Sequence, residues 1–367
     1  MKHNKYDLLL FIAVIIIATL GLIMIYSSSM VWAEYKFGDA FKYLKAQGIF
    51  LIIGIILMNF ISKISYKHYL NKANVIILIC FVLLILVLIP GIGTIRNGSR
   101  SWFGIGSLGI QPSEFAKLGL ILFTAKYLSK NQKKIKNIKK GVIPIISMTI
   151  LFFGIIMLQP DFGTGVILVM SIIGLLFIAG VKFSFFTKIG ILGILGAIGL
   201  ILAAPYRLQR IMTFINPWKD PLGSGFQTIQ SLFAIGPGGL LGLGLGNSIQ
   251  KHFYLPEPQT DFIYSIIIEE LGFFGSVLIS GLFIIIVIRG YMIAINAKDL
   301  FAKYLAFGIT FQITFQALLN LMVVVGMVPV TGITLPFISY GGSSLLITMI
   351  SVGVLLNISR YQEDRLR

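Results

Sequence analysis

The chain has 367 residues, of which 57% are hydrophobic and 12% are charged, and its formal net charge is +17 at pH 7. This composition excludes an ordinary soluble domain, because repeated apolar runs of about 17–25 residues are each long enough to cross a hydrocarbon core of about 30 Å. The single cysteine, Cys80, excludes an intramolecular disulfide. We therefore predict one all-α polytopic membrane domain that spans residues 1–367.

Apolar stretches in the sequence predict ten membrane-spanning helices. Lys2 and Lys5 precede the first, as in a signal peptide, but no small-residue cleavage site follows, so we expect a retained span. In the seventh span glycines recur at every third position from Gly190 to Gly199, which favours close helix packing over a moving segment. The predicted spans cover residues 7–27, 46–62, 74–90, 113–129, 141–158, 163–180, 188–204, 262–288, 303–325 and 341–357.

Lys and Arg residues concentrate in alternate connections between these spans. Most of the 30 fall on the side that also holds both termini, including a basic run at residues 130–140. Because short cytoplasmic connections are rich in Lys and Arg, we predict cytoplasmic N- and C-termini and a large extracytoplasmic loop, residues 205–261, between helices seven and eight. The basic run is interpreted as a topology signal in contact with membrane lipids, and nucleic acid is not expected as a partner.

The fourth span begins at Pro112, which suits the first turn of a helix. Glu114 and Lys117 follow, three residues apart on one helix face. Two interpretations stay open: a neutralised ion pair that helps helices pack, or a polar cavity in which Lys117 binds an anion while Glu114 holds it. Asp161, at the next outer turn, is expected to cap the following helix or to join the cavity.

The large outer loop contains an amphipathic segment and a glycine-rich run. Apolar residues from Phe226 to Phe233 recur at helical spacing, which predicts a short helix on the outer membrane surface that ends at Gly236. The glycine-rich run, residues 239–246, follows no strand of a βαβ unit, so a dinucleotide-binding fold is excluded. We expect flexible, re-entrant backbone there instead.

Three carboxylates, Asp261, Glu269 and Glu270, lie at the entry to the eighth span. On insertion scales a carboxylate at bilayer depth costs on the order of 2.5–3.5 kcal/mol, so partners must neutralise these groups or they perform chemistry. Asp261, Ser265 and Glu269 share one face of the predicted helix. A helix N-cap is the alternative role for Asp261, but it would not explain the deeper carboxylates.

Several segments are expected to converge on one outward-facing polar cleft. The last outer connection, residues 329–344, is broken by proline and glycine, and such backbone is tolerated at membrane depth where it lines a wet cavity. Clustered cations there suit a pyrophosphate or another polyanionic headgroup, and a carboxylate beside them can accept a proton from an attacking hydroxyl. The predicted substrate-binding residues are Arg100, Glu114, Lys117, Arg207, Arg210, Gln259, Thr260, Glu269, Ser339 and Ser343, with Asp261 as the catalytic group.

These features predict a transfer reaction on a lipid-linked pyrophosphate. The histidines, His3, His68 and His252, have no metal-ligand spacing, and no Ser/His/Asp or Cys/His arrangement is present. We expect no tightly bound cofactor, and a divalent cation, Mg²⁺ or Mn²⁺, stays open as an aid to catalysis.

Six motifs, all in the second half of the chain, are together specific enough to indicate a family. They are Arg207-Leu-Gln-Arg210, Asn216-Pro-Trp-Lys-Asp-Pro-Leu-Gly-Ser-Gly-Phe-Gln227, Tyr254-Leu-Pro-Glu-Pro-Gln-Thr-Asp-Phe-Ile263, Glu269-Glu-Leu-Gly272, Gly332-Ile-Thr-Leu-Pro-Phe-Ile-Ser-Tyr-Gly-Gly-Ser-Ser344 and Asn357-Ile-Ser-Arg360. The chain resembles the SEDS family (shape, elongation, division and sporulation) over essentially its whole length. It is most similar to the FtsW/SpoVE branch, because the RodA branch usually has a His where this chain has Pro258-Gln259.

The resemblance implies a ten-helix peptidoglycan glycosyltransferase of the bacterial cytoplasmic membrane. Such enzymes polymerise lipid II on the outer leaflet and work with a class B penicillin-binding protein, in division, sporulation or cell shape. By motif, Asp261 is the catalytic residue, and Arg100 and Lys117 are the basic residues of the Gly-Ser-Arg…Glu-Phe-Ala-Lys pattern. Family members often have a second basic residue, or Trp, directly after that Arg, where this chain has Ser101.

The mechanism we hypothesise has Asp261 deprotonate the 4-hydroxyl of the acceptor N-acetylglucosamine. That oxygen attacks and inverts the donor's anomeric carbon, while the four cations, Arg100, Lys117, Arg207 and Arg210, stabilise the departing undecaprenyl pyrophosphate. Two rival functions remain: a lipid II flippase, and a non-catalytic scaffold that docks divisome proteins.

Overall fold

The computed structural model describes residues 6–361 apart from residues 97, 105–108, 136, 203–211 and 213. The described chain is predominantly helical, with one two-stranded antiparallel hairpin. The predicted binding residues Arg207 and Arg210 lie outside the described residues. The helices are α1 (Leu8–Phe37), α2 (Lys42–Lys63), α3 (Tyr66–Leu86), α4 (Pro112–Lys130), α5 (Ile143–Leu158), α6 (Phe162–Ile178), α7 (Phe183–Leu202), α9 (Phe226–Ile235), α10 (Ile263–Ile295), α11 (Leu300–Val324) and α12 (Gly342–Ser359).

Short elements connect these helices. The hairpin strands are β1 (Thr94–Arg96) and β2 (Ser99–Trp102). A 3-10 turn, η1 (Gln132–Lys134), and a π-helical turn, η2 (Ile138–Val142), join α4 to α5, and two more 3-10 turns, η3 (Pro217–Lys219) and η4 (Gly236–Gly238), flank α9.

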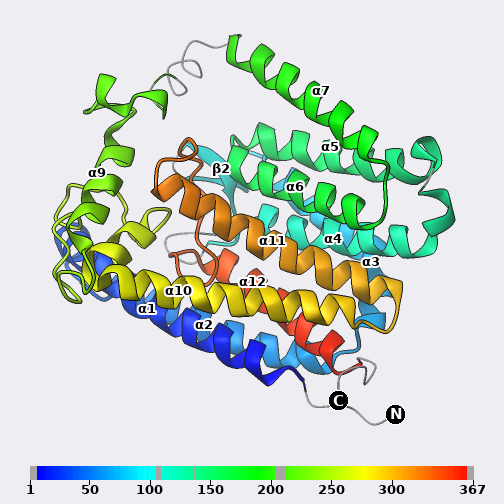
Figure 1. Ribbon diagram of the computed structural model, residues 1–367, viewed down its shortest axis with the longest axis horizontal. Coiled ribbons are helices and arrows are strands. Elements are labelled where there is room, and N and C mark those ends of the chain that lie inside the picture. The colour runs from blue at the N-terminus through cyan, green and yellow to red at the C-terminus, as the bar shows by residue number, and fades with distance from the viewer. Residues whose placement is uncertain are drawn as a thin grey trace.

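The long helices run side by side, with α11 near the middle of the bundle (Figure 1). It packs against α10, α4, α6 and α12, and α12 packs against α2. The start of α1 and the end of α12 lie at one end of the bundle, whereas β2 and α9 lie toward the other (Figure 1). We call these the terminal end and the hairpin end.

Each of the ten predicted spans coincides with a helix. Within the described residues, seven helical segments are long and apolar enough to cross a membrane, while α6 and the start of α7 are shorter. The polytopic all-α class is therefore confirmed, and the exact number of crossings stays a prediction. The seven segments are α1, α2, α3, Ile138–Leu158, α10, α11 and α12.

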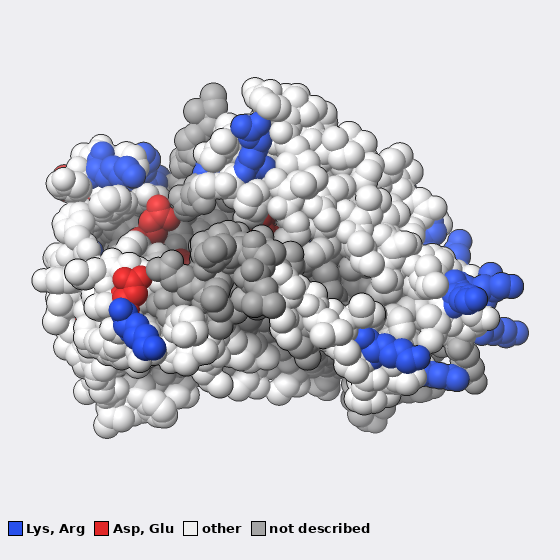
Figure 2. Space-filling view, turned by 90° about the horizontal axis from the view of Figure 1, so that it is seen from above, with Lys and Arg blue, Asp and Glu red and all other residues white. Residues whose placement is uncertain are grey.

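Positive charge gathers at the terminal end. The connection between α4 and α5 carries exposed Lys133, Lys134, Lys139 and Lys140. In the space-filling view, Lys and Arg cluster toward that end, whereas the other end shows both Lys or Arg and the acidic side chains visible on this face (Figure 2). The molecule is thus electrostatically asymmetric along the bundle.

Polar contacts at the terminal end tie several helices together. Asp7 caps α1 by accepting from Leu10 N at 3.0 Å, and it also receives Arg289 Nη2 of α10 at 2.6 Å. Tyr66 donates its hydroxyl to Asp299 at 2.5 Å, and Asn357 of α12 accepts from Tyr66 N at 2.8 Å. These contacts join α1, α3, α10, α11 and α12 at the end opposite the hairpin.

The glycine stripe of α7 does not pack as predicted. A Cβ built at Gly190, Gly193, Gly196 or Gly199 meets no atom of the described chain within 4 Å. Helix α7 lies at the outside of the bundle (Figure 1). The close-packing interpretation was wrong, because the glycine spacing shows which residues share a helix face but not whether another helix packs against it.

The predicted short helix in the outer loop is confirmed as α9, which ends at Gly236. Ile229 is buried, and Ser231 donates its hydroxyl to Val324 O at 2.8 Å. Helix α9 therefore docks on the ends of α10 and α11, with Phe233 left about half exposed.

The glycine-rich run is inserted into a break in α10. Gly272 has φ 65° and ψ −157°, so the helix is interrupted there. Carbonyls and amides freed by the break pair with the run instead of with the next helical turn, which accounts for backbone polar groups that would otherwise be buried without partners. The four bonds are Leu243 N to Glu269 O (2.9 Å), Gly244 N to Glu270 O (3.0 Å), Phe273 N to Gly239 O (2.9 Å) and Phe274 N to Leu240 O (3.2 Å).

Candidate active site

A cavity of about 1220 Å³ lies at the hairpin end. Its wall combines the β1–β2 hairpin, the first turn of α4, the loop before α10 and the segment before α12. It is large enough for an extended polar ligand. Its charged lining residues are Arg96, Glu114, Asp161, Lys251, Glu257 and Asp261, and the polar and aromatic ones include Gln111, Gln259, Thr260, Gln316, Thr334, Ser344, Trp32, Tyr43, Trp102 and Tyr340.

Asp261 lies on this wall, directly before α10. The N-cap of α10 is Phe262 and no side chain caps it, so the capping alternative for Asp261 is wrong. The Thr260 hydroxyl lies 2.9 Å from Asp261 Oδ1, and Asn320 of α11 donates to the Asp261 carbonyl at 2.7 Å. Burial raises the pKa of the Asp261 carboxyl, and the Thr260 hydrogen bond opposes part of that rise. A carboxyl with a raised pKa is suited to general acid–base catalysis.

The segment before α12 is fastened to the loop that carries Asp261. Tyr340 N donates to the Gln259 carbonyl at 2.8 Å, and Asn320 donates to the Ile333 carbonyl at 2.7 Å as well as to Asp261. Burial raises the pKa of Tyr340 to about 12, so its hydroxyl stays protonated. The Gln259 side-chain Oε1 is buried and accepts no hydrogen bond, which leaves it able to meet a ligand donor.

The Glu114–Lys117 pair is present, but only Glu114 reaches the wall. Lys117 Nζ lies 2.8 Å from Glu114 Oε1 and 3.1 Å from Gln316 Oε1, and the lysine is 1% exposed. Lys117 therefore sits one layer behind the cavity and orients two groups that line it. The prediction that Lys117 points into the cavity is wrong, because its ammonium group forms an ion pair with Glu114.

Asp161 fulfils both roles predicted for it. It caps α6 by accepting from Thr164 N at 3.2 Å, and it lines the cavity. Gln111 Nε2 donates to its other oxygen at 2.8 Å. Burial raises the pKa of Asp161, as it does for Asp261.

Arg100 is not part of the cavity wall. Its neighbours on β2, Ser99 and Ser101, line the cavity, whereas the Arg100 side chain lies against Gly93. Arg96 of β1, which pairs with Ser99, lines the cavity instead.

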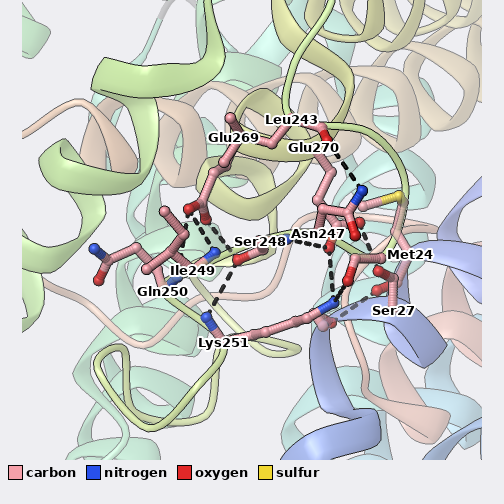
Figure 3. A network of polar contacts seen from close by, with 12 residues as sticks. Met24, Ser27, Leu243, Asn247, Ser248, Ile249, Gln250, Lys251, Glu269 and Glu270 are labelled. Atoms are coloured by element: carbon pink, nitrogen blue, oxygen red, sulfur yellow. Dashed lines mark hydrogen bonds and ion pairs between the residues drawn. The ribbon is translucent and has the colours of Figure 1, made fainter.

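Glu269 and Glu270 bind residues of the outer loop (Figure 3) and do not line the cavity. Glu269 accepts from Ser248 Oγ at 2.5 Å and from Ile249 N at 2.8 Å. Glu270 accepts from Ser27 Oγ of α1 at 2.5 Å and forms an ion pair with Lys251 at 3.2 Å. Both glutamates are fully buried, so the predicted substrate contact of Glu269 is wrong: donors from residues 248–250 occupy its carboxylate inside the fold.

Two predicted serines are structural. Ser339 Oγ accepts from Leu335 N at 2.8 Å, and Ser343 Oγ accepts from Gln111 N at 3.0 Å and donates to Gly109 O at 2.9 Å. Neither lines the cavity, whereas the adjacent Ser344 does. Sequence reasoning chose the wrong serine because turn geometry decides which hydroxyl faces the ligand.

Within the described part of the chain, no group of three or more His, Cys, Asp or Glu side chains is placed to hold a metal ion. Four of the predicted site residues line the same cavity: Glu114, Gln259, Thr260 and Asp261. Arg96, Gln316 and Tyr340, which join them there, were missed.

Comparison with known proteins bears on what this cavity does. A family model described as a cell cycle protein of the FtsW, RodA and SpoVE type matches residues 7–364. The chain belongs to the FtsW/RodA/SpoVE family. It is 53% identical to stage V sporulation protein E of Bacillus subtilis (strain 168), over 98% of each chain. It is 41% identical to a probable peptidoglycan glycosyltransferase FtsW of Geobacter sp. (strain M18), again over 98% of each chain.

Solved structures of family members share the fold. A chain from a peptidoglycan synthase complex, studied for the coordination of polymerization and crosslinking, superposes with a TM-score of 0.80 at 30% identity, over 98% of this chain and 99% of that one. Thermus thermophilus rod shape determining protein RodA gives a TM-score of 0.70 at 28% identity, over 98% of each chain. The predicted FtsW/RodA/SpoVE membership and the similarity to the FtsW/SpoVE branch are confirmed.

Proposed function

We propose that this chain is a peptidoglycan glycosyltransferase that polymerises lipid II into glycan strands on the outer face of the bacterial cytoplasmic membrane. The observation that carries the proposal is the position of Asp261, a partly buried carboxyl of raised pKa on the wall of a cavity of about 1220 Å³. Family membership over residues 7–364 supports the reaction class.

In the proposed mechanism Asp261 is the general base. Its carboxylate accepts the proton of the 4-hydroxyl of the acceptor N-acetylglucosamine, and that oxygen attacks the donor's anomeric carbon from the side opposite the pyrophosphate. The bond to the pyrophosphate breaks, and undecaprenyl pyrophosphate leaves with the bonding electrons. The Thr260 hydroxyl and the Asn320 amide fix the carboxyl and its backbone, so little reorganisation precedes proton transfer.

The rest of the wall suits a saccharide. Side-chain amides of Gln111, Gln259 and Gln316 and the hydroxyls of Thr334 and Ser344 offer donors and acceptors for sugar hydroxyls. The departing pyrophosphate requires positive charge. Arg207 and Arg210 stay predicted contributors from the undescribed part of the outer loop. The described carboxylates form no cluster fit for Mg²⁺ or Mn²⁺, so no step is derived through a metal.

We also propose the orientation and the partner. The basic terminal end lies in the cytoplasm, and the hairpin end with its cavity faces outward, because cytoplasmic connections are enriched in Lys and Arg. A class B penicillin-binding protein is the proposed partner, as part of a division or sporulation assembly. A structural relative from a synthase complex that couples polymerization and crosslinking supports this pairing.

Purified protein with labelled lipid II, with and without a class B penicillin-binding protein, tests the proposal. Glycan ladders on a gel are the expected result. Movement of labelled lipid II between the leaflets of proteoliposomes, with no polymer formed under any partner condition, would instead identify a flippase. Neither polymer nor movement, with intact partner binding, would identify a scaffold.

A further inference from the structure

Arg96 occupies an unusual position on the cavity wall. Its guanidinium carbon lies 4.8 Å from the centroid of the Trp102 ring, across the hairpin. Its other side is set against Gly109, where a side chain would collide with the guanidinium. A cation held between an aromatic face and backbone keeps a fixed direction.

The hairpin that carries Arg96 is itself well anchored. Ser99, its partner in the register, donates its hydroxyl to the Gln159 carbonyl between α5 and α6. Phe103 and Ile110 exchange two backbone hydrogen bonds of 2.8 Å. The strand therefore presents Arg96 from a rigid support, which favours preorganised binding.

Among described residues around the cavity, Arg96 differs from the other cations in having no carboxylate partner. Lys117 is paired with Glu114, and Lys251 is paired with Glu270. Arg96 forms no such pair, and its Nη2 is buried without a hydrogen-bond partner. A buried donor on a charged group costs free energy when unpaired, and the described part of the chain supplies no acceptor for this nitrogen.

We propose that Arg96 binds the pyrophosphate of the polyprenyl-linked substrate, in the role that the sequence motifs assign to Arg100. The inference rests on the proposed function for the identity of the ligand. Its support is independent of the motifs: a forked, planar donor on the cavity wall matches phosphate oxygens, and a neutral wall residue would not.

Direct ligand binding separates this inference from the polymerisation reaction. The probe is geranylgeranyl pyrophosphate, titrated calorimetrically into the full-length protein in detergent, with geranylgeraniol as the uncharged comparison. R96Q removes the charge, R96K keeps it without the planar fork, and R100Q removes the neighbouring cation. K45Q, at a lysine 65% exposed and paired with Asp39, is the control for general charge loss at the hairpin end.

The expected result is a loss of pyrophosphate affinity of roughly 10- to 100-fold in R96Q, the size of one charge-assisted hydrogen bond, and a smaller loss in R96K. R100Q and K45Q should bind within a few-fold of the unmodified protein, and geranylgeraniol should not distinguish the variants. Equal affinity in R96Q, or a larger loss in R100Q, would overturn the assignment. A melting temperature for R96Q equal to that of R100Q controls for folding, and R96K tests the site if R96Q does not fold.

The same variants in the lipid II assay distinguish the two proposals. A protein that binds pyrophosphate through Arg96 but makes no glycan in any condition would contradict the proposed function and leave this inference standing. If the protein polymerises lipid II and R96Q leaves the KM unchanged, the proposed function stands and the role of Arg96 is contradicted.

Discussion

Asp261 and Thr260 form the smallest functional unit of the site. Partial burial raises the pKa of the Asp261 carboxyl, and the Thr260 hydroxyl 2.9 Å away favours its ionised form and so opposes part of that rise. A base must be ionised to accept a proton, so the balance of these two effects sets the pH below which the reaction fails.

Replacing Thr260 with Val should therefore move the acid limb of kcat/KM for polymerisation to higher pH. The substitution removes the hydrogen bond that lowers the pKa of Asp261, so the carboxyl stays protonated to a higher pH. A pH profile of initial rates at low lipid II concentration measures the shift. An acid limb that stays in place, or moves to lower pH, would contradict the role given to Thr260.

At this scale the sequence locates some groups and misplaces others. Asp261, Gln259, Thr260 and Glu114 were predicted correctly for the cavity because motif and helix spacing place them at the outer ends of helices. Glu269 was misplaced because the loop that donates hydrogen bonds to it lies about 20 residues away in the chain, and the contact between them is a tertiary effect. The position of Arg96 could have been predicted from the sequence. Asn97-Gly98 between β-type residues is a strong hairpin signal, and it places the residues on either side of it in one hairpin.

At the scale of elements, the break in α10 connects the outer loop to the bundle. Gly272 lies in a region of φ and ψ open almost only to glycine, and a Cβ there would collide with the backbone of Gly242 and Leu240. The inserted glycine-rich run in turn leads to residues 248–251, which Glu269 and Glu270 hold.

G272A should destabilise the protein by at least about 1–3 kcal/mol from backbone strain alone, with the collision adding to that. G281A is the matched control, because Gly281 lies in the same helix and a Cβ there meets no atom within 4 Å. Its expected effect is neutral or slightly stabilising, since alanine favours helix over glycine. Melting temperatures in one detergent compare the two, and equal values would contradict the account of the break.

The Lys251–Glu270 pair offers a second test at this scale. Both side chains are fully buried, so K251M strands a carboxylate and should cost about 3–5 kcal/mol of stability. K251M/E270Q removes the stranded charge and should recover part of the melting temperature, while K45M at the exposed Lys45–Asp39 pair should leave it unchanged. A double variant less stable than K251M would show that the pair is not what holds the loop.

Helix positions followed from hydropathy, but the break in α10 did not. The predicted span at residues 262–288 falls within α10, yet nothing in its apolar pattern marks Gly272 as a point of interruption. Helix α9 was predicted from its spacing and confirmed, because an amphipathic face is a local property. The packing of α7 was not predicted, because it depends on which neighbours are present.

At the scale of the whole molecule, the basic connection between α4 and α5 and the cavity lie at opposite ends of the helix bundle. Exposed lysines gather at the terminal end, and the cavity lies at the hairpin end (Figure 2). A substrate presented at the outer leaflet would then meet the cavity directly.

Cysteine labelling tests the proposed orientation. In a Cys80→Ala background, Lys45→Cys at the hairpin end should react with a membrane-impermeant maleimide in spheroplasts, and Lys133→Cys should react only in inside-out vesicles. The physical basis is the Lys and Arg enrichment of cytoplasmic connections. The reverse pattern would invert the topology and place the cavity in the cytoplasm.

The most direct test of the central claim is polymerisation of purified lipid II by D261N, assayed with its class B penicillin-binding protein. Loss of a general base commonly lowers the rate by about 10²–10⁴-fold, so D261N should be nearly inactive while it retains the fold and partner binding. D39N, at a carboxylate between α1 and α2 whose side chain is 38% exposed, should polymerise normally. A D261N protein that makes glycan strands at the unmodified rate would contradict the account.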